Sequence, residues 1–101
     1  MLPVERLALL VNWRPQAREA LLEILGYIEE RNLIAAADLQ SAIETAVDGL
    51  LAFPFTGRRG REDGSRELVV TANYIVVYQV SDRIDVLDVL HARQQYPKIT
   101  G

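Results

Sequence analysis

Residues 65–97 read SRELVVTANYIVVYQVSDRIDVLDVLHARQQYP, and this stretch decides the fold because it holds three strand-like runs separated by two short turns. The runs are residues 69–71, 74–80 and 84–90. They are rich in β-branched and aromatic side chains, and the Asn and Ser-Asp-Arg sequences between them are typical of turns. The stretch therefore predicts a three-stranded antiparallel meander, which ends in three polar side chains at its rim: His91, Arg93 and Tyr96.

Two amphipathic helices are predicted before the meander, over residues 15–31 and 35–51. Apolar residues recur there at spacings of three and four, the period of one helix face. The first stripe is Ala17, Leu21, Ile24 and Ile28, and the second is Ala36, Leu39, Ile43, Ala46 and Leu50. Because only a few residues separate the helices, we expect an antiparallel hairpin whose stripes meet each other and the sheet.

A short apolar run, residues 7–13, precedes the helices and ends before Pro15, so we interpret it as a first strand. Residues 53–64 are rich in glycine and charge and are predicted to form an exposed loop. The expected fold class is therefore α+β: an N-terminal strand, a helical hairpin and a three-stranded meander, in the order β-α-α-β-β-β. We expect one domain over residues 1–101.

Composition limits the function classes that fit this chain. With 101 residues and 50% hydrophobic content, it can bury one core without disulfides or metal. The absence of cysteine excludes a thiol nucleophile and thiolate zinc ligands, and a single histidine remains, so we expect neither a metal site nor a cofactor. No apolar run is long enough to span a membrane, and the N-terminal residues lack the pattern of a signal peptide. We expect a cytoplasmic protein.

Charge is distributed unevenly along the chain. Residues 1–50 carry four Arg against eight Asp or Glu, whereas residues 51–101 carry seven Lys or Arg against six acidic residues. Broad nucleic-acid binding normally requires a basic face, so the acidic first half argues against it. The local exception is the sequence GRRGREDGSR, which contains Arg58, Arg59, Arg61 and Arg66.

Several short motifs, taken in order, resemble the RelE/ParE superfamily of toxins from bacterial type II toxin–antitoxin modules. The resemblance covers nearly the whole chain, and its ending is most similar to the ParE branch. The motifs are Trp13-x-Pro15-x-Ala17-Arg18, Tyr27-Ile28, Phe53-Pro54, Gly57-Arg58, Arg66-Glu67-Leu68, Asn73-Tyr74-Ile75-Val76-Val77-Tyr78 and Val89-Leu90-His91-Ala92-Arg93-Gln94-Gln95-Tyr96-Pro97. The resemblance implies a small toxin neutralised by a cognate antitoxin in a hetero-oligomer. Its target would be DNA gyrase or the ribosome, and contact with operator DNA would come only through the antitoxin.

The two branches of the superfamily require different chemistry. RelE-like toxins cut messenger RNA with several basic side chains that converge on one phosphate. In that comparison Arg66 and Arg93 occupy two of the basic positions, whereas Leu68 and Ile75 occupy two others. The resemblance therefore favours gyrase inhibition, with no catalytic residue, over ribosome-dependent RNA cleavage.

The residues expected to matter differ between these two functions. A ribonuclease would use Arg66, His91, Arg93 and Tyr96, with His91 as a general base because its ordinary pKa lies near neutrality. A binding protein would contact its target or antitoxin through Arg58, Arg59, Arg61, Arg66, Arg93 and Tyr96. Each also has a structural alternative: a backbone-bonded histidine, a packed C-terminal tail, a solvated charge run or a surface ion pair. Trp13 and Tyr27 are expected in core or hairpin packing.

Overall fold

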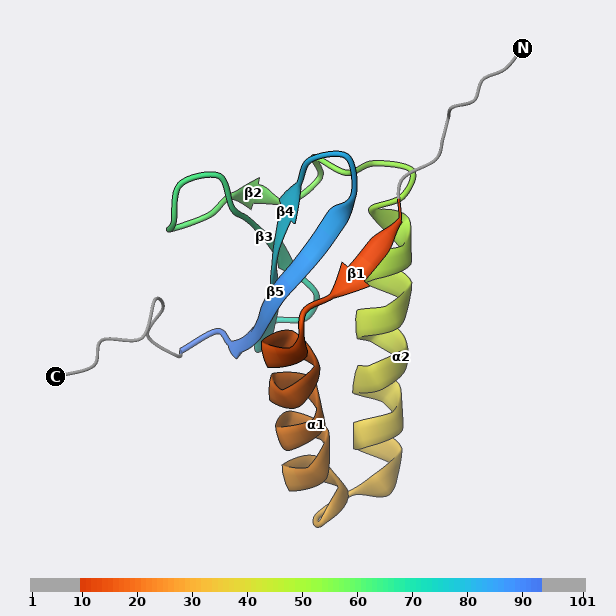
Figure 1. The fold of residues 1–101 in the computed structure, drawn as a ribbon. Coiled ribbons are helices and arrows are strands. Elements are labelled where there is room, and N and C mark those ends of the chain that lie inside the picture. The colour runs from red at the N-terminus through yellow and green to blue at the C-terminus, as the bar shows by residue number, and fades with distance from the viewer. Residues whose placement is uncertain (1–9, 94–101) are drawn as a thin grey trace, which may run out of the picture.

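The computed structural model describes residues 10–93, and its elements follow the predicted order (Figure 1). They are β1 (Val11–Trp13), α1 (Pro15–Glu29), α2 (Leu33–Gly49), β2 (Arg58–Arg59), β3 (Arg66–Val69), β4 (Tyr74–Val80) and β5 (Ile84–His91). The α+β class is confirmed. The predicted loop over residues 53–64 differs in one respect, because it contains the two-residue strand β2.

The five strands form one mixed sheet in the order β1-β5-β4-β3-β2. The predicted meander is confirmed, since β3, β4 and β5 pair antiparallel. The first strand of the chain pairs in parallel with the last, with Asn12 opposite Asp85. Such a parallel neighbour requires a crossover connection, which the helical hairpin supplies together with the rest of the chain between them.

The strand before β4 begins earlier than the sequence predicts. We expected it over residues 69–71, but β3 covers Arg66–Val69, and residues 70–73 form the turn into β4. Thr71 makes this turn because its Oγ1 accepts a hydrogen bond from the backbone N–H of Asn73 (3.1 Å). A hydroxyl side chain that bonds the backbone two residues later favours a turn over a strand.

Local signals fix the first residue of each helix in the hairpin. Pro15 opens α1, where its missing N–H leaves no intrahelical bond unmade. Asn32 caps α2, because its side-chain oxygen accepts a hydrogen bond from the backbone N–H of Ala35 (3.0 Å). The cap begins α2 two residues before the predicted start and sets the short turn between the antiparallel helices.

The hairpin packs on one face of the sheet, and its turn extends beyond the strands (Figure 1). Ile43 lies at the centre of this contact and is fully buried. The buried core also contains Ala17, Leu25, Ala36, Leu39, Val47, Val76, Val86 and Val89. Trp13 is half-buried against this core as expected, whereas Tyr27 lies outside it, 62% exposed, with its ring beneath the guanidinium of Arg31 (3.8 Å).

A register shift between β4 and β5 places the core residues of β5. Val77 lies opposite Asp88 while Tyr78 lies opposite Val86, so Leu87 is left without a partner. Such a bulge changes the alternation of side chains between the two faces. Val86 and Val89, three residues apart, therefore both reach the core under the helices.

Within the described range, 10–93, no helix is long and apolar enough to cross a membrane. Residues 7–9 of the predicted first strand, and Tyr96 with Pro97, lie outside the described residues.

Candidate functional site

The corner formed by β2, β3 and the preceding turn brings together the four arginines of the GRRGREDGSR sequence. Strands β2 and β3 pair antiparallel, with Arg58 opposite Glu67 and Arg59 opposite Arg66. Because side chains alternate along a strand, the two pairs project from opposite faces of the sheet. Arg66 also lies opposite Tyr78, whose ring packs in the core on the hairpin side, so Arg59 and Arg66 belong to that side.

Glu67 organises the face away from the hairpin. Its carboxylate is almost completely buried, with 1% of the side chain exposed. Arg58 donates to one oxygen at 3.1 Å, and Arg61 approaches the other through its Nε at 3.3 Å and its backbone N–H at 3.2 Å. A buried charge is tolerated only when it is paired and hydrogen-bonded in this way. We call Glu67, Arg58 and Arg61 the Glu67 cluster.

Two of the three loop arginines are therefore held by a buried carboxylate and are not a solvated charge run. Glu67 forms no ion pair with Arg66, its neighbour in the chain, among the described residues. Instead these two side chains project from opposite faces, and Glu67 pairs across the strands. Strand alternation alone could have suggested that Glu67 is buried. Its pairing with Arg58 depends on the register between β2 and β3, and the sequence of β2 has no strand-like pattern.

Arg66 contacts the turn at residues 53–57, which precedes β2. One guanidinium nitrogen donates to the carbonyl oxygens of Gly57 (2.7 Å) and Phe55 (3.2 Å). The guanidinium also lies over the ring of Phe55, 4.9 Å from its centre. Arg66 is thus half-buried and oriented by the turn, with the rest of its guanidinium facing outward.

The side chain of Tyr78 binds the same turn from the core of the protein. Its fully buried hydroxyl accepts a hydrogen bond from the backbone N–H of Gly57 (2.9 Å) and donates one to the carbonyl of Pro54 (2.8 Å). We call residues 53–57 the anchored turn, because Tyr78 and Arg66 both bind its backbone. The anchored turn in consequence presents two exposed aromatic rings, Phe53 (72% exposed) and Phe55 (62% exposed).

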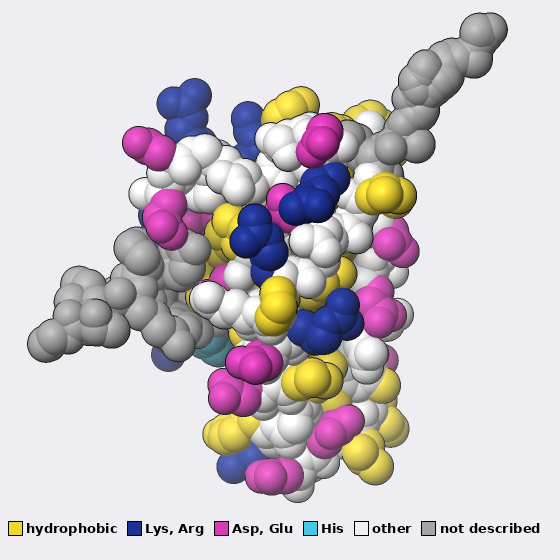
Figure 2. All heavy atoms as spheres, viewed as in Figure 1, with side chains coloured by type: hydrophobic (Ala, Val, Ile, Leu, Met, Phe, Trp, Pro, Cys, Tyr) yellow, Lys and Arg dark blue, Asp and Glu magenta, His cyan; other side chains and the backbone are white. Residues whose placement is uncertain are grey.

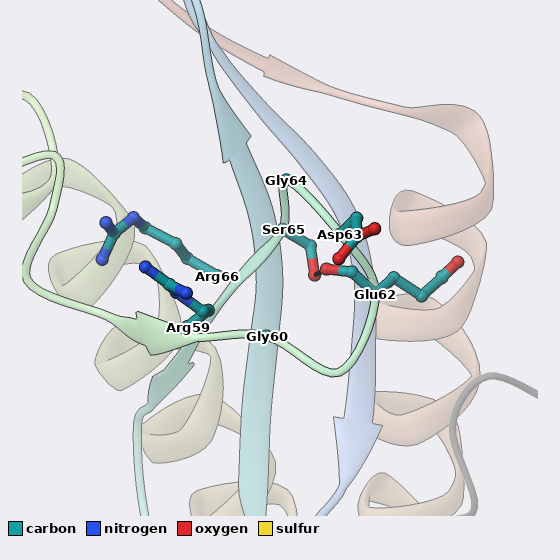
Figure 3. A pocket seen from close by; sticks show the side chains of 7 residues that line it. All are labelled: Arg59, Gly60, Glu62, Asp63, Gly64, Ser65 and Arg66. Atoms are coloured by element: carbon teal, nitrogen blue, oxygen red, sulfur yellow. Dashed lines mark hydrogen bonds between the residues drawn. The ribbon is translucent and has the colours of Figure 1, made fainter.

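A pocket of about 350 Å³ lies on the β2–β3 connection (Figure 3). Its lining residues are Arg59, Gly60, Glu62, Asp63, Gly64, Ser65 and Arg66. Figure 3 shows the side chains of Arg59 and Arg66 extending together to one side, while Glu62 and Asp63 lie on the other. The glycines serve the connection: Gly64 has a positive φ of 81°, which favours glycine.

The rim residues of the meander lie elsewhere on the sheet. His91 ends β5 opposite Tyr74, and the two rings meet edge to face with centres 5.3 Å apart. The backbone N–H of Arg93 donates to His91 Nδ1 at 3.2 Å, so the imidazole binds the backbone two residues after the end of β5. The Arg93 side chain is exposed, and Tyr96 lies outside the described residues.

The structure does not bring Arg66 and His91 together. Arg66 lies opposite Tyr78 and His91 opposite Tyr74, so the two are offset by four residues along β4 and separated by the width of that strand. Four residues at about 3.3 Å each along the strand, together with two spacings of about 4.8 Å from β3 across β4 to β5, place their backbones roughly 16 Å apart. Of the ribonuclease candidates, Arg66 and His91 therefore lie apart on the sheet, and Tyr96 lies outside the described residues.

A second polar cluster joins β1 to β5. The buried carboxylate of Asp85 accepts a hydrogen bond from the Asn12 side chain (2.8 Å), and Arg83 and Arg14 lie 3.1 and 3.6 Å from it. The Asn12 hydrogen bond lowers the pKa of Asp85 below its usual value, and the two arginines add to this effect against the opposing influence of burial. The cluster stabilises the parallel pairing of β1.

Exposed side chains divide the surface into two parts. Figure 2 shows acidic and hydrophobic side chains over the lower part of the hairpin, whereas most of the visible arginine side chains lie over the sheet. The large exposed hydrophobic residues of the hairpin are Leu22, Tyr27, Leu33 and Ile34. Two surfaces are therefore candidates for binding a partner: the apolar and acidic end of the hairpin, and the basic corner beside the anchored turn.

Solved structures of two toxin–antitoxin systems share this fold. The chain superposes on the chromosomal ParDE system of P. aeruginosa with a TM-score of 0.73 and 19% identity, covering 82% of this chain and 95% of the other. For the toxin–antitoxin complex RelBE2 of Mycobacterium tuberculosis the TM-score is 0.56 and the identity 20%, covering 84% and 99%. These likenesses show that the chain shares the fold of these two systems.

Sequence comparison then identifies the family. Residues 11–96 match the family described as "ParE toxin of type II toxin-antitoxin system, parDE". The chain is also 41% identical over 90 residues to "Putative toxin Y4kP" of Sinorhizobium fredii (strain NBRC 101917 / NGR234), covering 88% of this chain and 94% of that protein. The chain belongs to the ParE toxin family of type II toxin–antitoxin systems.

Proposed function

We propose that this ParE-family toxin arrests growth by binding DNA gyrase, without catalysing a reaction of its own. The observation that carries the proposal is the separation of Arg66 from His91 on the sheet. Arg66 also donates two hydrogen bonds to carbonyls of the anchored turn. Leu68 and Ile75, at two positions that would be basic in a RelE-like ribonuclease, are apolar. Electrostatic catalysis of phosphate cleavage needs donors that converge on the developing charge, and this arrangement supports binding instead.

The test measures gyrase and messenger RNA side by side. Purified toxin should inhibit supercoiling of relaxed plasmid by gyrase, and messenger RNA in cells induced to make the toxin should stay intact. Cleaved messenger RNA with normal supercoiling would favour the alternative, a ribosome-dependent endoribonuclease. Neither effect, with no growth arrest, would mean that this copy poisons nothing.

Two variants separate a binding surface from a catalytic group. His91→Ala should leave gyrase inhibition largely intact because binding requires no proton transfer, whereas Arg93→Ala should weaken it by removing an exposed contact. Arg18→Ala, an equally exposed arginine on α1, is the matched control. A folded His91→Ala protein that has lost all toxicity would contradict gyrase binding, because loss of a general acid or base lowers rates by about 10²-fold or more.

We further propose that a cognate antitoxin neutralises the toxin in a hetero-oligomer and supplies all contact with operator DNA. The net charge of −3 supports this division, because a DNA-binding surface is normally basic. The strand pairing also supports binding of an antitoxin. Strand β2 pairs only with Arg66 and Glu67 of β3, so the outer side of Leu68 and Val69 has no strand partner within the described sheet. A partner segment could add there as a strand. Tight binding of the operator by purified toxin alone would contradict the division.

A further inference from the structure

Arg59 and Arg66 form a pair of like charges that the fold itself does not neutralise. They lie directly opposite each other on β2 and β3, an arrangement that is destabilising for like charges. The only acid at this point of the ladder, Glu67, is buried on the other face and is bound by Arg58 and Arg61. Among residues 10–93, Arg59 has neither a hydrogen bond nor an ion pair through its side chain. We call Arg59 and Arg66 the arginine pair.

The backbone that carries Arg59 and the side chain of Arg66 are nevertheless held in place. The Glu67 cluster fixes β2 through Arg58, the immediate neighbour of Arg59, and the anchored turn orients Arg66 through two carbonyls and the ring of Phe55. Figure 3 shows both guanidinium groups on the same side of the strands, away from Glu62 and Asp63. Two adjacent guanidinium groups, of which Arg66 is already oriented by the anchored turn, are suited to bind one anionic oxygen group with charge-assisted hydrogen bonds.

We propose that the arginine pair binds a carboxylate of the antitoxin, carried by a segment that lies along the β2–β3 edge. This inference rests on the proposed function, since it assigns a surface to the antitoxin that neutralises the toxin. The site has the parts that such a segment requires: two cations, the uncovered outer side of β3 at Leu68 and Val69, and the exposed rings of Phe53 and Phe55 beside them. Acidic side chains would meet the arginines, and apolar ones would meet the rings.

Charge distinguishes this partner from a nucleic acid. A phosphate backbone carries a continuous row of negative charges, and binding it depends on several cations that each displace counterions. Here only two arginines are available, Glu62 and Asp63 line the same pocket, and the chain has a net charge of −3. A single carboxylate would need only the side of the pocket to which the arginines extend, whereas a longer row of phosphates would also approach the acids on the other side.

The test measures binding of the purified full-length antitoxin, encoded beside the toxin, to toxin variants by calorimetry or surface plasmon resonance. Arg59→Glu should weaken binding at least tenfold, because an acid then faces the incoming carboxylate. Arg18→Glu makes the same charge change at another exposed arginine and should alter binding less than twofold. Arg59 is chosen over Arg66 because Arg66 also holds the anchored turn.

Stability of the free toxin provides a second readout with the opposite sign. Arg59→Glu replaces a like-charge pair with an ion pair across β2 and β3, so the melting temperature of the free toxin should rise by about 1–4 °C. A rise in melting temperature together with weaker antitoxin binding would support the inference, since unfolding could not explain the lost affinity.

A charge exchange identifies the carboxylate. Each Asp or Glu in the C-terminal segment of the antitoxin is changed to Lys in turn, and one of these variants should bind Arg59→Glu toxin at least tenfold more tightly than the unchanged antitoxin does. Unchanged affinity for Arg59→Glu would overturn the inference while leaving the proposed function in place. So would loss of single-stranded RNA binding in Arg59→Glu, without loss of antitoxin binding. If the antitoxin failed to bind unmodified toxin, the proposed function would fall as well.

Discussion

The contact between hairpin and sheet and the corner at β2–β3 are stabilised by different forces. Under the hairpin most buried side chains are apolar, Ile43, Val76 and Val86 among them, and the buried Asp88 accepts a hydrogen bond from the Gln16 side chain of α1 (3.1 Å). At the corner, the backbone of the anchored turn and the short strand β2 are held by hydrogen bonds and ion pairs from Tyr78, Arg66 and Glu67. Apolar packing tolerates shape changes of limited size, whereas polar networks depend on every partner. The scaffold and the candidate site of this toxin should therefore respond differently to substitution.

The largest effect is expected in the apolar contact. Ile43→Ala removes a fully buried side chain and leaves a cavity between helix and sheet, which should lower the free energy of unfolding by about 2–5 kcal/mol. Ile34→Ala is the matched control, because Ile34 lies on the same helix but is 74% exposed, and it should change stability by less than about 0.5 kcal/mol. Urea denaturation checks both predictions. Equal midpoints for the two variants would contradict the buried position of Ile43.

A pair of glycine substitutions contrasts the corner with the hairpin. An added Cβ at Gly57 would lie 2.7 Å from the ring of Tyr78 and 2.9 Å from the carbonyl of Glu67, so Gly57→Ala should destabilise the protein by about 1–3 kcal/mol. At Gly26, within α1, nothing lies within 4 Å of the added Cβ, and Gly26→Ala should stabilise the helix by about 0.5–1 kcal/mol. Opposite shifts in thermal melting are expected; shifts of the same sign would contradict the close approach at Gly57.

The hydroxyl of Tyr78 tests the polar network without changing the shape of the core. Tyr78→Phe leaves the buried N–H of Gly57 without its acceptor, which should cost about 1–3 kcal/mol. Tyr27→Phe is the control, because that ring is exposed and should be nearly neutral. If the corner is a unit, hydrogen exchange of the backbone amides at residues 57–61 should accelerate in Tyr78→Phe and stay unchanged in Tyr27→Phe.

The same contrast explains how much could be predicted from the sequence. The helices follow from local periodicity, such as the spacing of Ile24 and Ile28, and the meander follows from runs of β-branched and aromatic residues between turn sequences; both were predicted correctly. The corner depends on partners distant in the chain: Tyr78 lies 21 residues from Gly57, and Arg58 and Glu67 meet through a register that no local pattern specifies. Strand β2 was missed because two arginines carry no strand signal, and its pairing follows from long-range contacts.

The candidate site was therefore predicted by residue type more than by arrangement. The sequence singled out all four loop arginines, yet it could not separate Arg58 and Arg61, which bind Glu67, from Arg59, which binds none of the described residues. Nor could it measure the distance between Arg66 and His91, because that follows from the strand order. The roles of these residues toward gyrase and the antitoxin stay predictions.

The smallest effect concerns pH and the Asp85 cluster, a polar contact that lies in the scaffold instead of the corner. The pKa of Asp85 is lowered in the folded protein, mainly by the Asn12 hydrogen bond, and an unfolded aspartate titrates near 3.9. A depressed folded pKa contributes stability that is fully present above about pH 5 and is lost as the pH falls through the folded value. Wild type should therefore lose stability relative to Asp85→Asn on acidification from pH 7 to about pH 2.

The difference in urea midpoint between wild type and Asp85→Asn should shrink as the pH falls from 7 to about 2. The reason is that Asn at position 85 cannot titrate, so the variant lacks only the contribution of the charged carboxylate beside Arg83 and Arg14. A midpoint difference at position 85 that is independent of pH would mean that the Asn12 and arginine contacts do not favour the ionised form, and that β1 is held to β5 by its backbone pairing alone.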